Sequence, residues 1–198
     1  GEVIGVDIEI SKKIADKLGK KLVIKDVAFD SIINELNSGK ADFAAAGMSI
    51  DPERSEKVDF SIEYITSNQV VVVKKDSDIK SIDDIKDKRI SVQLGTVADT
   101  YVTKNYKDAK INRLKKFLVA AEDVKNNKSD CIVMDAIPAN ELVKSNPELK
   151  VLDGILFQDK YGMAVKKGNK ELLNSINLVL EELIKDKKID EYIIKFSE

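Results

Sequence analysis

Residues 44–61 read AAAGMSIDPERSEKVDFS, and this stretch decides the fold. Its small apolar residues indicate a buried strand that ends at Gly47, where the missing Cβ lets a ligand approach the backbone closely. Asp51 is expected to cap a short helix that begins with a proline. Arg54 then lies one turn into that helix, near the strand end. A guanidinium there suits a carboxylate, and the Ser49 hydroxyl can add a further contact.

Taken alone, Arg54 has a plainer explanation. It fits an exposed arginine at the start of a helix, paired with Glu53 or Glu56. Surface ion pairs of this kind contribute little to stability. The carboxylate-binding hypothesis therefore depends on what the rest of the chain supplies.

Helical and strand patterns alternate on both sides of this stretch. Towards the amino end we expect a helix at Asp7–Leu18, a strand at Lys21–Lys25, a helix at Asp30–Asn37 and a strand at Asp42–Ala46. Towards the carboxyl end the order returns as a strand at Arg89–Leu94, a helix at Val97–Tyr106, a strand at Ile111–Leu114, a helix at Ala121–Asn126 and a strand at Cys131–Met134. This alternation is typical of an α/β fold built from βαβ units.

The two series superimpose at an offset of about 88 to 90 positions, which indicates an internal repeat. Six pairs share this spacing: Gly5 and Gly95, Lys21 and Lys110, Phe29 and Phe117, Lys40 and Lys128, Asp42 and Asp130, and Gly47 and Asp135. Two similar α/β lobes would explain the agreement, and chance similarity of two ordinary βαβ segments is the alternative. The strand at Arg89–Leu94 has no counterpart before Gly5, so we expect the first strand of the first lobe to be missing. Its absence would leave backbone N–H groups of the neighbouring strands unpaired unless another segment or chain pairs with them.

The chain is expected to cross twice between the lobes. Two segments rich in β-branched residues, Gln69–Lys74 and Tyr161–Lys166, are placed to form a two-strand hinge. Lobe 1 then comprises residues 1–72 plus 163–198, and lobe 2 comprises residues 73–162. The last stretch, Lys170–Phe196, has apolar residues at helical spacing and is expected to pack back on lobe 1.

Two further passages place polar groups at strand ends. Gly95 joins a strand to a helix whose N-cap is Thr96, with Asp99 placed as the acid of a capping box. The N–H groups at such a helix start attract a small anion. Asp135 ends an apolar strand at the repeat position of Gly47, where a carboxylate can receive an ammonium group. Capping the next helix is its alternative role, and the two roles are compatible.

A cation and an anion at strand ends, together with a helix N-terminus, match the charges of a free amino acid. In open α/β sheets the ligand lies beyond the carboxyl ends of the strands, so Gly47 and Asp135 are expected to face each other across the lobes. Phe29, just before the second helix, is expected to offer an apolar wall to the ligand side chain, with an ordinary core position as the alternative.

The composition removes several other functions. The 33 Lys and Arg against 35 Asp and Glu leave a net charge of −2, and the two signs are interleaved, so no basic face for nucleic acid is expected. With no His and the single Cys131, the common zinc sites, the Ser-His and Cys-His catalytic pairs and an internal disulfide are excluded. Apolar runs such as Val70–Val73 are far too short to cross a bilayer. We expect no catalytic residue, metal or cofactor.

At these residues the chain resembles the bacterial extracellular solute-binding proteins of family 3, the polar amino-acid binding subunits of ABC importers. The matching pieces follow the family's order: GVDIE at 5–9, AD at 41–42, GMSI at 47–50, PER at 52–54, VDFS at 58–61, QLGT at 93–96 and YGMAV at 161–165. The resemblance implies a periplasmic binding protein type 2 fold, in which two α/β lobes joined by a two-strand hinge close on a free amino acid. Gln93, Ser49 and Gln158, as residues of the expected cleft, favour a polar or cationic side chain for that ligand. The chain departs from the family before Gly1, where members carry a first strand and an aromatic-containing loop.

The resemblance also assigns roles to site residues. Arg54 would grip the α-carboxylate with the backbone of Thr96 and the hydroxyl of Ser49. Asp135 and the Gly47 carbonyl would take the α-amino group. Along the ligand side chain, Phe29 would pack and Gln158 would form part of the wall.

The partners implied by the resemblance are a free amino acid and the membrane permease of an ABC importer. The location implied is outside the cytoplasm, either periplasmic or lipid-anchored at the cell surface as a lipoprotein. We expect a monomer, with a strand-swapped dimer as the alternative. Two other functions stay open: a ligand-sensing domain of a membrane receptor, and a cyclohexadienyl-type dehydratase on the same fold, which would need a general acid in the cleft.

Overall fold

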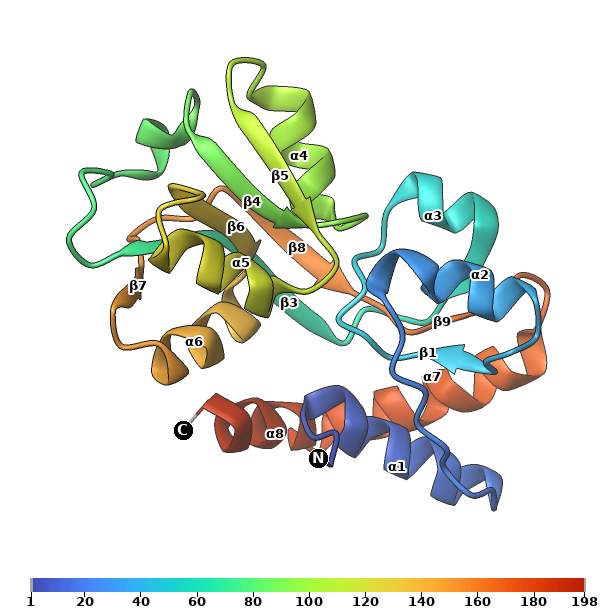
Figure 1. The fold of residues 1–198 in the computed structure, drawn as a ribbon. Helices are drawn as coiled ribbons and strands as arrows, with labels where there is room; N and C mark the ends of the chain where they lie inside the picture. Colours follow the sequence, from blue (N-terminus) through green and yellow to red (C-terminus); the bar gives the residue numbers. More distant parts are fainter. Residues whose placement is uncertain (1, 198) are drawn as a thin grey trace. The chain divides into compact units, whose positions relative to one another are not determined.

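A computed structural model describes residues 2–197 of the chain (Figure 1). Within it the chain divides into two compact units. Unit 1 comprises residues 2–27, 31–66 and 160–197, and unit 2 comprises residues 28–30 and 67–159. Helices and a sheet occur in both units, which confirms the expected α/β class.

Unit 1 contains a small antiparallel sheet. Its strand order is β1 (Phe43–Ala44), β9 (Ala164–Lys166) and β2 (Val58–Phe60). Val165 of β9 lies opposite Phe43 on one side and Asp59 on the other. The returning chain therefore holds β1 and β2 in one sheet, with the short helix α3 (Pro52–Lys57) between them in sequence.

Four further helices complete unit 1: α1 (Val6–Leu18), α2 (Ile32–Asn37), α7 (Lys170–Lys185) and α8 (Lys188–Ser197). Helix α1 buries Ile10 and Ile14, which are one turn apart, and ends at Gly19 in the left-handed conformation. It contacts both α7 and α8, and the three helices lie side by side in Figure 1. The last stretch thus packs on unit 1 as expected, but as two helices that part at Lys187, where φ is 56°.

The strand expected at Lys21–Lys25 is wrong. Residues 20–28 have no regular secondary structure, and Val23 and Ile24 are 78% and 44% exposed. The segment that corresponds to it in the repeat is β5 (Lys110–Leu114), which is paired along its length with β4 (Arg89–Gln93). Among residues 2–5 there is no strand that could play the part of β4, and an extended segment without a hydrogen-bonding neighbour is not a stable strand.

Unit 2 is built on a six-stranded mixed sheet. Its strand order is β5, β4, β6 (Cys131–Asp135), β3 (Ile65–Lys74) and β7 (Leu149–Val151), with β8 (Phe157–Tyr161) also paired to β3. Strands β5, β4 and β6 run parallel, and β3 is antiparallel to both β6 and β7. The carboxyl ends of β4 and β6 therefore lie at the same edge of the sheet.

Side chains alternate between two buried clusters along β3, because successive residues of a strand point to opposite faces. Val71 and Val73 pack in the cluster that contains Val102 of α4 (Val97–Asn105). Val70 and Val72 pack in the cluster that contains residues of α5 (Phe117–Lys125) and α6 (Ala136–Ser145). Helices thus cover both faces, which explains why the run from Val70 to Val73 is apolar without a break.

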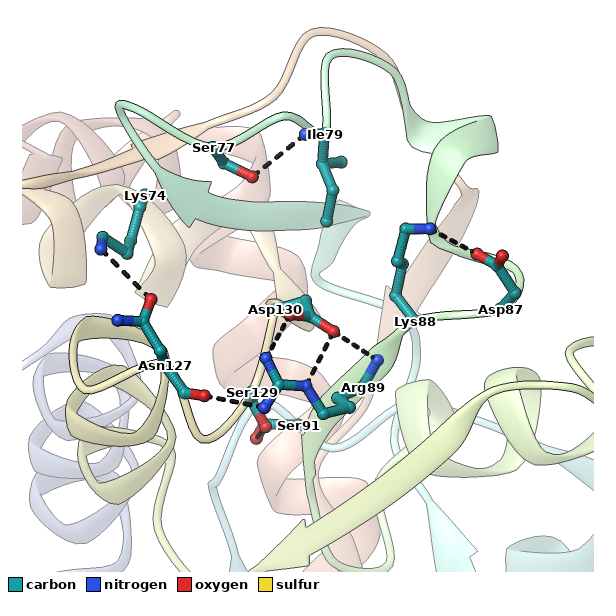
Figure 2. Close-up of polar contacts among 10 residues, drawn as sticks. All are labelled: Lys74, Ser77, Ile79, Asp87, Lys88, Arg89, Ser91, Asn127, Ser129 and Asp130. Atoms are coloured by element: carbon teal, nitrogen blue, oxygen red, sulfur yellow. Dashed lines mark hydrogen bonds and ion pairs between the residues drawn. The ribbon is translucent and has the colours of Figure 1, made fainter.

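A polar cluster ties β4 to β6 at their amino ends (Figure 2). Arg89 donates from Nε and Nη2 to the carboxylate of Asp130, at 3.0 and 2.6 Å, and from Nη1 to the carbonyl of Asn127 at 2.7 Å. The hydroxyls of Ser91 and Ser129 form a buried hydrogen bond of 2.6 Å. These contacts stabilise the end of the sheet away from the candidate site.

The two segments expected to cross between the lobes lie close to the points where the chain passes between the units. Gln69–Lys74 is part of β3 in the sheet of unit 2, and Tyr161–Lys166 is divided between β8 and β9 in unit 1. The chain passes from one unit to the other between Thr66 and Ser67 and between Asp159 and Lys160, within β3 and β8. A hinge at these strands stays a prediction.

Candidate functional site

Arg54 is a buried cation in unit 1, only 9% exposed. Asp51 caps α3 as expected, because its carboxylate accepts a hydrogen bond from the main-chain N of Arg54 at 3.0 Å. The guanidinium donates from Nη1 to the carbonyl of Ser49 at 2.8 Å, and its Nε lies 3.2 Å from Asp51 Oδ2. The alternative of an exposed arginine paired with Glu53 or Glu56 is therefore wrong. A guanidinium fixed in this way presents its planar fork in one orientation.

Gly47 is held by a buried carboxylate that sequence reasoning missed. Its N–H donates to Asp7 Oδ2 at 2.7 Å, and the hydroxyl of Tyr64 donates to Asp7 Oδ1 at 2.6 Å. Burial raises the pKa of Asp7, while these two hydrogen bonds act in the opposite direction. Gly47 has φ +54°, and a Cβ there would lie 3.3 Å from the ring of Tyr161, so both the backbone and the space favour glycine.

Three of the expected site residues are thus brought together in one loop of unit 1. Gly47, Ser49 and Arg54 lie between β1 and the end of α3, and Ser49 also forms a β-bridge with Tyr161. The loop is anchored at one end by Asp7 and at the other by the Arg54 contacts. These contacts therefore hold the main chain of the segment at both ends.

In unit 2 the turn after β4 is held by side-chain hydrogen bonds. Thr96 caps α4 as expected: its hydroxyl accepts from Asp99 N at 3.3 Å and donates to the carbonyl of Gln93 at 2.8 Å. Asp99 accepts from the N–H of Gly95 at 3.2 Å, not from that of Thr96, so the expected capping box is displaced by one residue. Arg113 donates to Asp99 at 2.8 Å. The first N–H groups of α4 have no acceptor within the helix, as at the start of any helix. The contacts of Thr96 and Asp99 hold these groups in a fixed orientation.

Asp135 is the last residue of β6 and the N-cap of α6. Its Oδ1 accepts from Ile137 N at 3.0 Å, so the capping role is confirmed. Two side chains of β3 also donate to the carboxylate: Ser67 to Oδ1 at 2.6 Å and Gln69 to Oδ2 at 3.4 Å. Because β4 and β6 are parallel neighbours, Asp135 lies at the same sheet edge as the turn that contains Thr96.

The last two residues expected in the site, Phe29 and Gln158, also lie in unit 2. Phe29 begins a short 3₁₀ helix, Phe29–Ser31, and is half-buried, so it is not a fully buried core residue. The next residue, Asp30, packs on Gly95, where an added Cβ would lie 3.3 Å from the Asp30 Cβ. Gln158 is exposed on β8, and its amide donates to Asn68 at 3.4 Å.

Asp7, Tyr64, Ser67 and Gln69 were not predicted as site residues. One signal was available for the pair in β3, because polar residues at 67 and 69 share the strand face that Val71 and Val73 continue with apolar side chains. For Asp7 and Tyr64 the only sign was that Asp7 lies within the GVDIE piece. Nothing local indicates which backbone N–H its carboxylate would accept from.

Residues 2–197 contain no group of three or more acidic, His or Cys side chains that could hold a metal ion. In the same part of the chain, no helix is both long enough and apolar enough to cross a membrane. Unit 1 offers a fixed cation, and unit 2 offers a fixed carboxylate and oriented main-chain donors. Such groups bind a small charged molecule through hydrogen bonds and ion pairs.

Comparison with known proteins agrees with this chemistry. The family described as bacterial extracellular solute-binding proteins, family 3, matches residues 1–198. The chain is 34% identical over 190 residues to the ABC transporter arginine-binding protein 1 of Escherichia coli (strain K12), covering 93% of this chain and 78% of that protein.

Two solved structures of an ancestral arginine-binding protein are also similar. The form bound to arginine has a TM-score of 0.93 and 42% identity, and the form bound to glutamine has a TM-score of 0.93 and 41% identity. Each comparison covers 100% of this chain and 90% of the other. The fold is therefore that of these arginine-binding proteins, and the chain belongs to the bacterial extracellular solute-binding proteins of family 3.

Proposed function

We propose that this protein binds a free amino acid with a polar or cationic side chain outside the cytoplasm, and delivers it to the membrane permease of an ABC importer. The observation that carries the proposal is the buried, pre-oriented guanidinium of Arg54. A planar fork of donors in a region of low dielectric binds a carboxylate strongly. Every free amino acid carries an α-carboxylate, so Arg54 recognises the feature that all such ligands share.

Asp135 supplies the complementary charge. It receives the α-ammonium group, while its bond to Ile137 N keeps the carboxylate at the start of α6. An enzyme would need a group that exchanges protons with its substrate, whereas these groups only pair with charges that the ligand already has. The relatives are named as binding proteins, which supports binding without chemistry.

The remaining residues complete the contacts. The Ser49 hydroxyl and the backbone of Thr96 assist with the carboxylate, and the Gly47 carbonyl assists with the ammonium group. Phe29 packs along the ligand side chain. Gln158 contributes a polar wall to the side-chain pocket, which suits a ligand with a polar end.

The choice of ligand is supported by the relatives. One is named arginine-binding, and an ancestral arginine-binding protein has been solved with arginine and with glutamine. These two side chains are long and end in hydrogen-bonding nitrogen groups. Arginine is the first ligand to test.

The family is described as extracellular, which supports a location outside the cytoplasm. A periplasmic or lipid-anchored form, the permease partner and a monomeric state are parts of the proposal. Closure of the two lobes on the ligand is also a part of it, because the ligand's differential affinity for the closed form would drive that change.

The test is thermal unfolding of ligand-stripped protein with each common amino acid and with cystine. At about 1,000 times its dissociation constant a ligand adds about 4 kcal/mol, which raises Tm by roughly 10 °C in a chain of this size. We expect arginine, or a few polar amino acids, to give such a shift, and apolar ones to give none. A folded chain whose Tm responds to no amino acid would overturn the proposal.

A further inference from the structure

Asp135 shares its carboxylate with two buried polar side chains of β3. Ser67 is 4% exposed and Gln69 is 2% exposed. Gln69 lies directly opposite Asp135 in the antiparallel pairing of β3 with β6, and Ser67 lies two residues before it. Opposite residues of a strand pair, and residues two apart on one strand, point to the same face. The register therefore brings all three side chains together.

Within residues 2–197, only the nitrogen of the Gln69 amide is hydrogen-bonded, and its oxygen is not. Its Nε2 donates to Asp135 Oδ2 at 3.4 Å, while its Oε1 is buried and has no hydrogen-bond partner in the part of the chain that the structure describes. Turning the amide over would place Oε1 against a carboxylate oxygen, and two acceptors cannot bond to each other. The acceptor oxygens of Asp135 thus set the orientation of the amide.

An unpaired buried acceptor is destabilising, and an apolar side chain of the same shape would avoid that cost. Apolar residues fill the next four positions of the strand, Val70 to Val73. A glutamine at position 69 therefore costs stability through its acceptor, while its amide nitrogen donates to Asp135. Conflicts between local stability and sequence choice are expected at functional sites.

We infer that Ser67 and Gln69 are positioning residues that hold the Asp135 carboxylate in the orientation that receives the ligand's ammonium group. The inference rests on the proposed function. Ser67 donates to Oδ1 and Gln69 donates to Oδ2, so the two bonds together restrict rotation of the carboxylate plane. A carboxylate fixed before binding loses less freedom when the ligand arrives, which increases affinity.

The test uses the whole chain, stripped of ligand, and calorimetric titration with L-arginine. Ser67→Ala should weaken binding about ten- to a hundredfold, as expected for a hydrogen bond to a charged group, and Gln69→Met about three- to tenfold, because its bond is longer. Gln69→Met should leave Tm unchanged or higher, since it removes the unpaired acceptor. A loss of affinity without a loss of stability is a result that a merely structural role would not give.

The matched control is Ser91→Ala, which deletes a buried hydroxyl of the same unit at the other end of the sheet (Figure 2). It leaves Ser129 without its partner, so Tm should fall while arginine affinity stays unchanged. Ser67→Thr keeps the hydroxyl and should restore most of the affinity that Ser67→Ala loses.

A second ligand tests whether the loss of affinity involves the α-amino group. The probe 5-guanidinopentanoic acid is arginine without its α-amino group, so Ser67→Ala and Gln69→Met should bind it as tightly as the unaltered chain does. Equal losses for both ligands, or arginine affinity unchanged in both variants, would overturn the inference and leave the proposed function intact. If the unaltered chain binds no amino acid, the proposed function fails and the inference fails with it.

Discussion

Replacing Arg54 by alanine separates two roles of this side chain. In the folded protein it satisfies the Ser49 carbonyl, whose residue is 4% exposed, at 2.8 Å. Loss of that charged donor removes a hydrogen bond to a buried residue, which costs about 1–3 kcal/mol. The contact with Asp51 adds little, because the Asp51 side chain is 28% exposed. The cap of α3 survives, because Asp51 accepts from the main chain. The free energy of unfolding should therefore fall by about 1–3 kcal/mol.

Binding should suffer more than folding. Truncation of one partner of a desolvated charge pair costs about 2–5 kcal/mol, which corresponds to about 30-fold to several thousandfold in dissociation constant. Titration calorimetry with L-arginine, well below the Tm of Arg54→Ala, measures the affinity, and urea denaturation measures the stability. The two effects are then read from the same preparation.

The matched control is Arg89→Ala, because Arg89 likewise donates to a carboxylate, that of Asp130, and to a main-chain carbonyl, that of Asn127, at the amino ends of the strands (Figure 2). It should lower stability without changing arginine affinity. An affinity of Arg54→Ala within about threefold of the unaltered chain, or an equal loss in Arg89→Ala, would refute the carboxylate-binding role.

Three further predictions concern stability and reactivity. Burial raises the pKa of Asp7 above its ordinary 3.8, so its contribution to stability is present below that value and is lost as pH rises through the raised pKa. Carboxyls whose pKa is lowered, such as Asp130, act in the opposite direction in both proteins, so the free energy of unfolding of the unaltered chain should fall relative to that of Asp7→Asn in urea denaturation from about pH 3 to about pH 7. Gly47→Ala should lower the free energy of unfolding by about 1–2 kcal/mol or more, because alanine is strained at φ +54° and its Cβ would press on the Tyr161 ring. An unchanged Tm would contradict this strain. Burial raises the pKa of Cys131 to about 12, so a chromogenic disulfide reagent should react only after unfolding, and rapid reaction of the native protein would contradict this.

Local signals predicted local structure well. The Asp51 cap of α3 and the Thr96 cap of α4 both form as expected, because a capping residue bonds to an N–H only three positions away. Helix α1 follows its apolar spacing for the same reason. These interactions depend on residues within one or two turns, so the sequence contains all that is needed.

Signals that depend on a distant partner failed. The segment at 21–25 has the composition of a strand, but a strand exists only where another segment pairs with it. The helical spacing over Lys170–Phe196 gave no sign of the break at Lys187, whose left-handed conformation divides the stretch into two helices. Nothing local indicated that Gln69–Lys74 would pair with β6 and β7 in one sheet.

The sequence by itself determined the α/β class, the family resemblance, the absence of His and the placing of Arg54 and Asp135 beside strand ends. Only the tertiary structure decided how these groups are held. Asp7 reaches a backbone N–H 40 residues away, and Ser67 reaches Asp135 across 68 residues. Contacts over such separations are set by strand register and helix packing, which the whole chain fixes together, and no short stretch of residues encodes them.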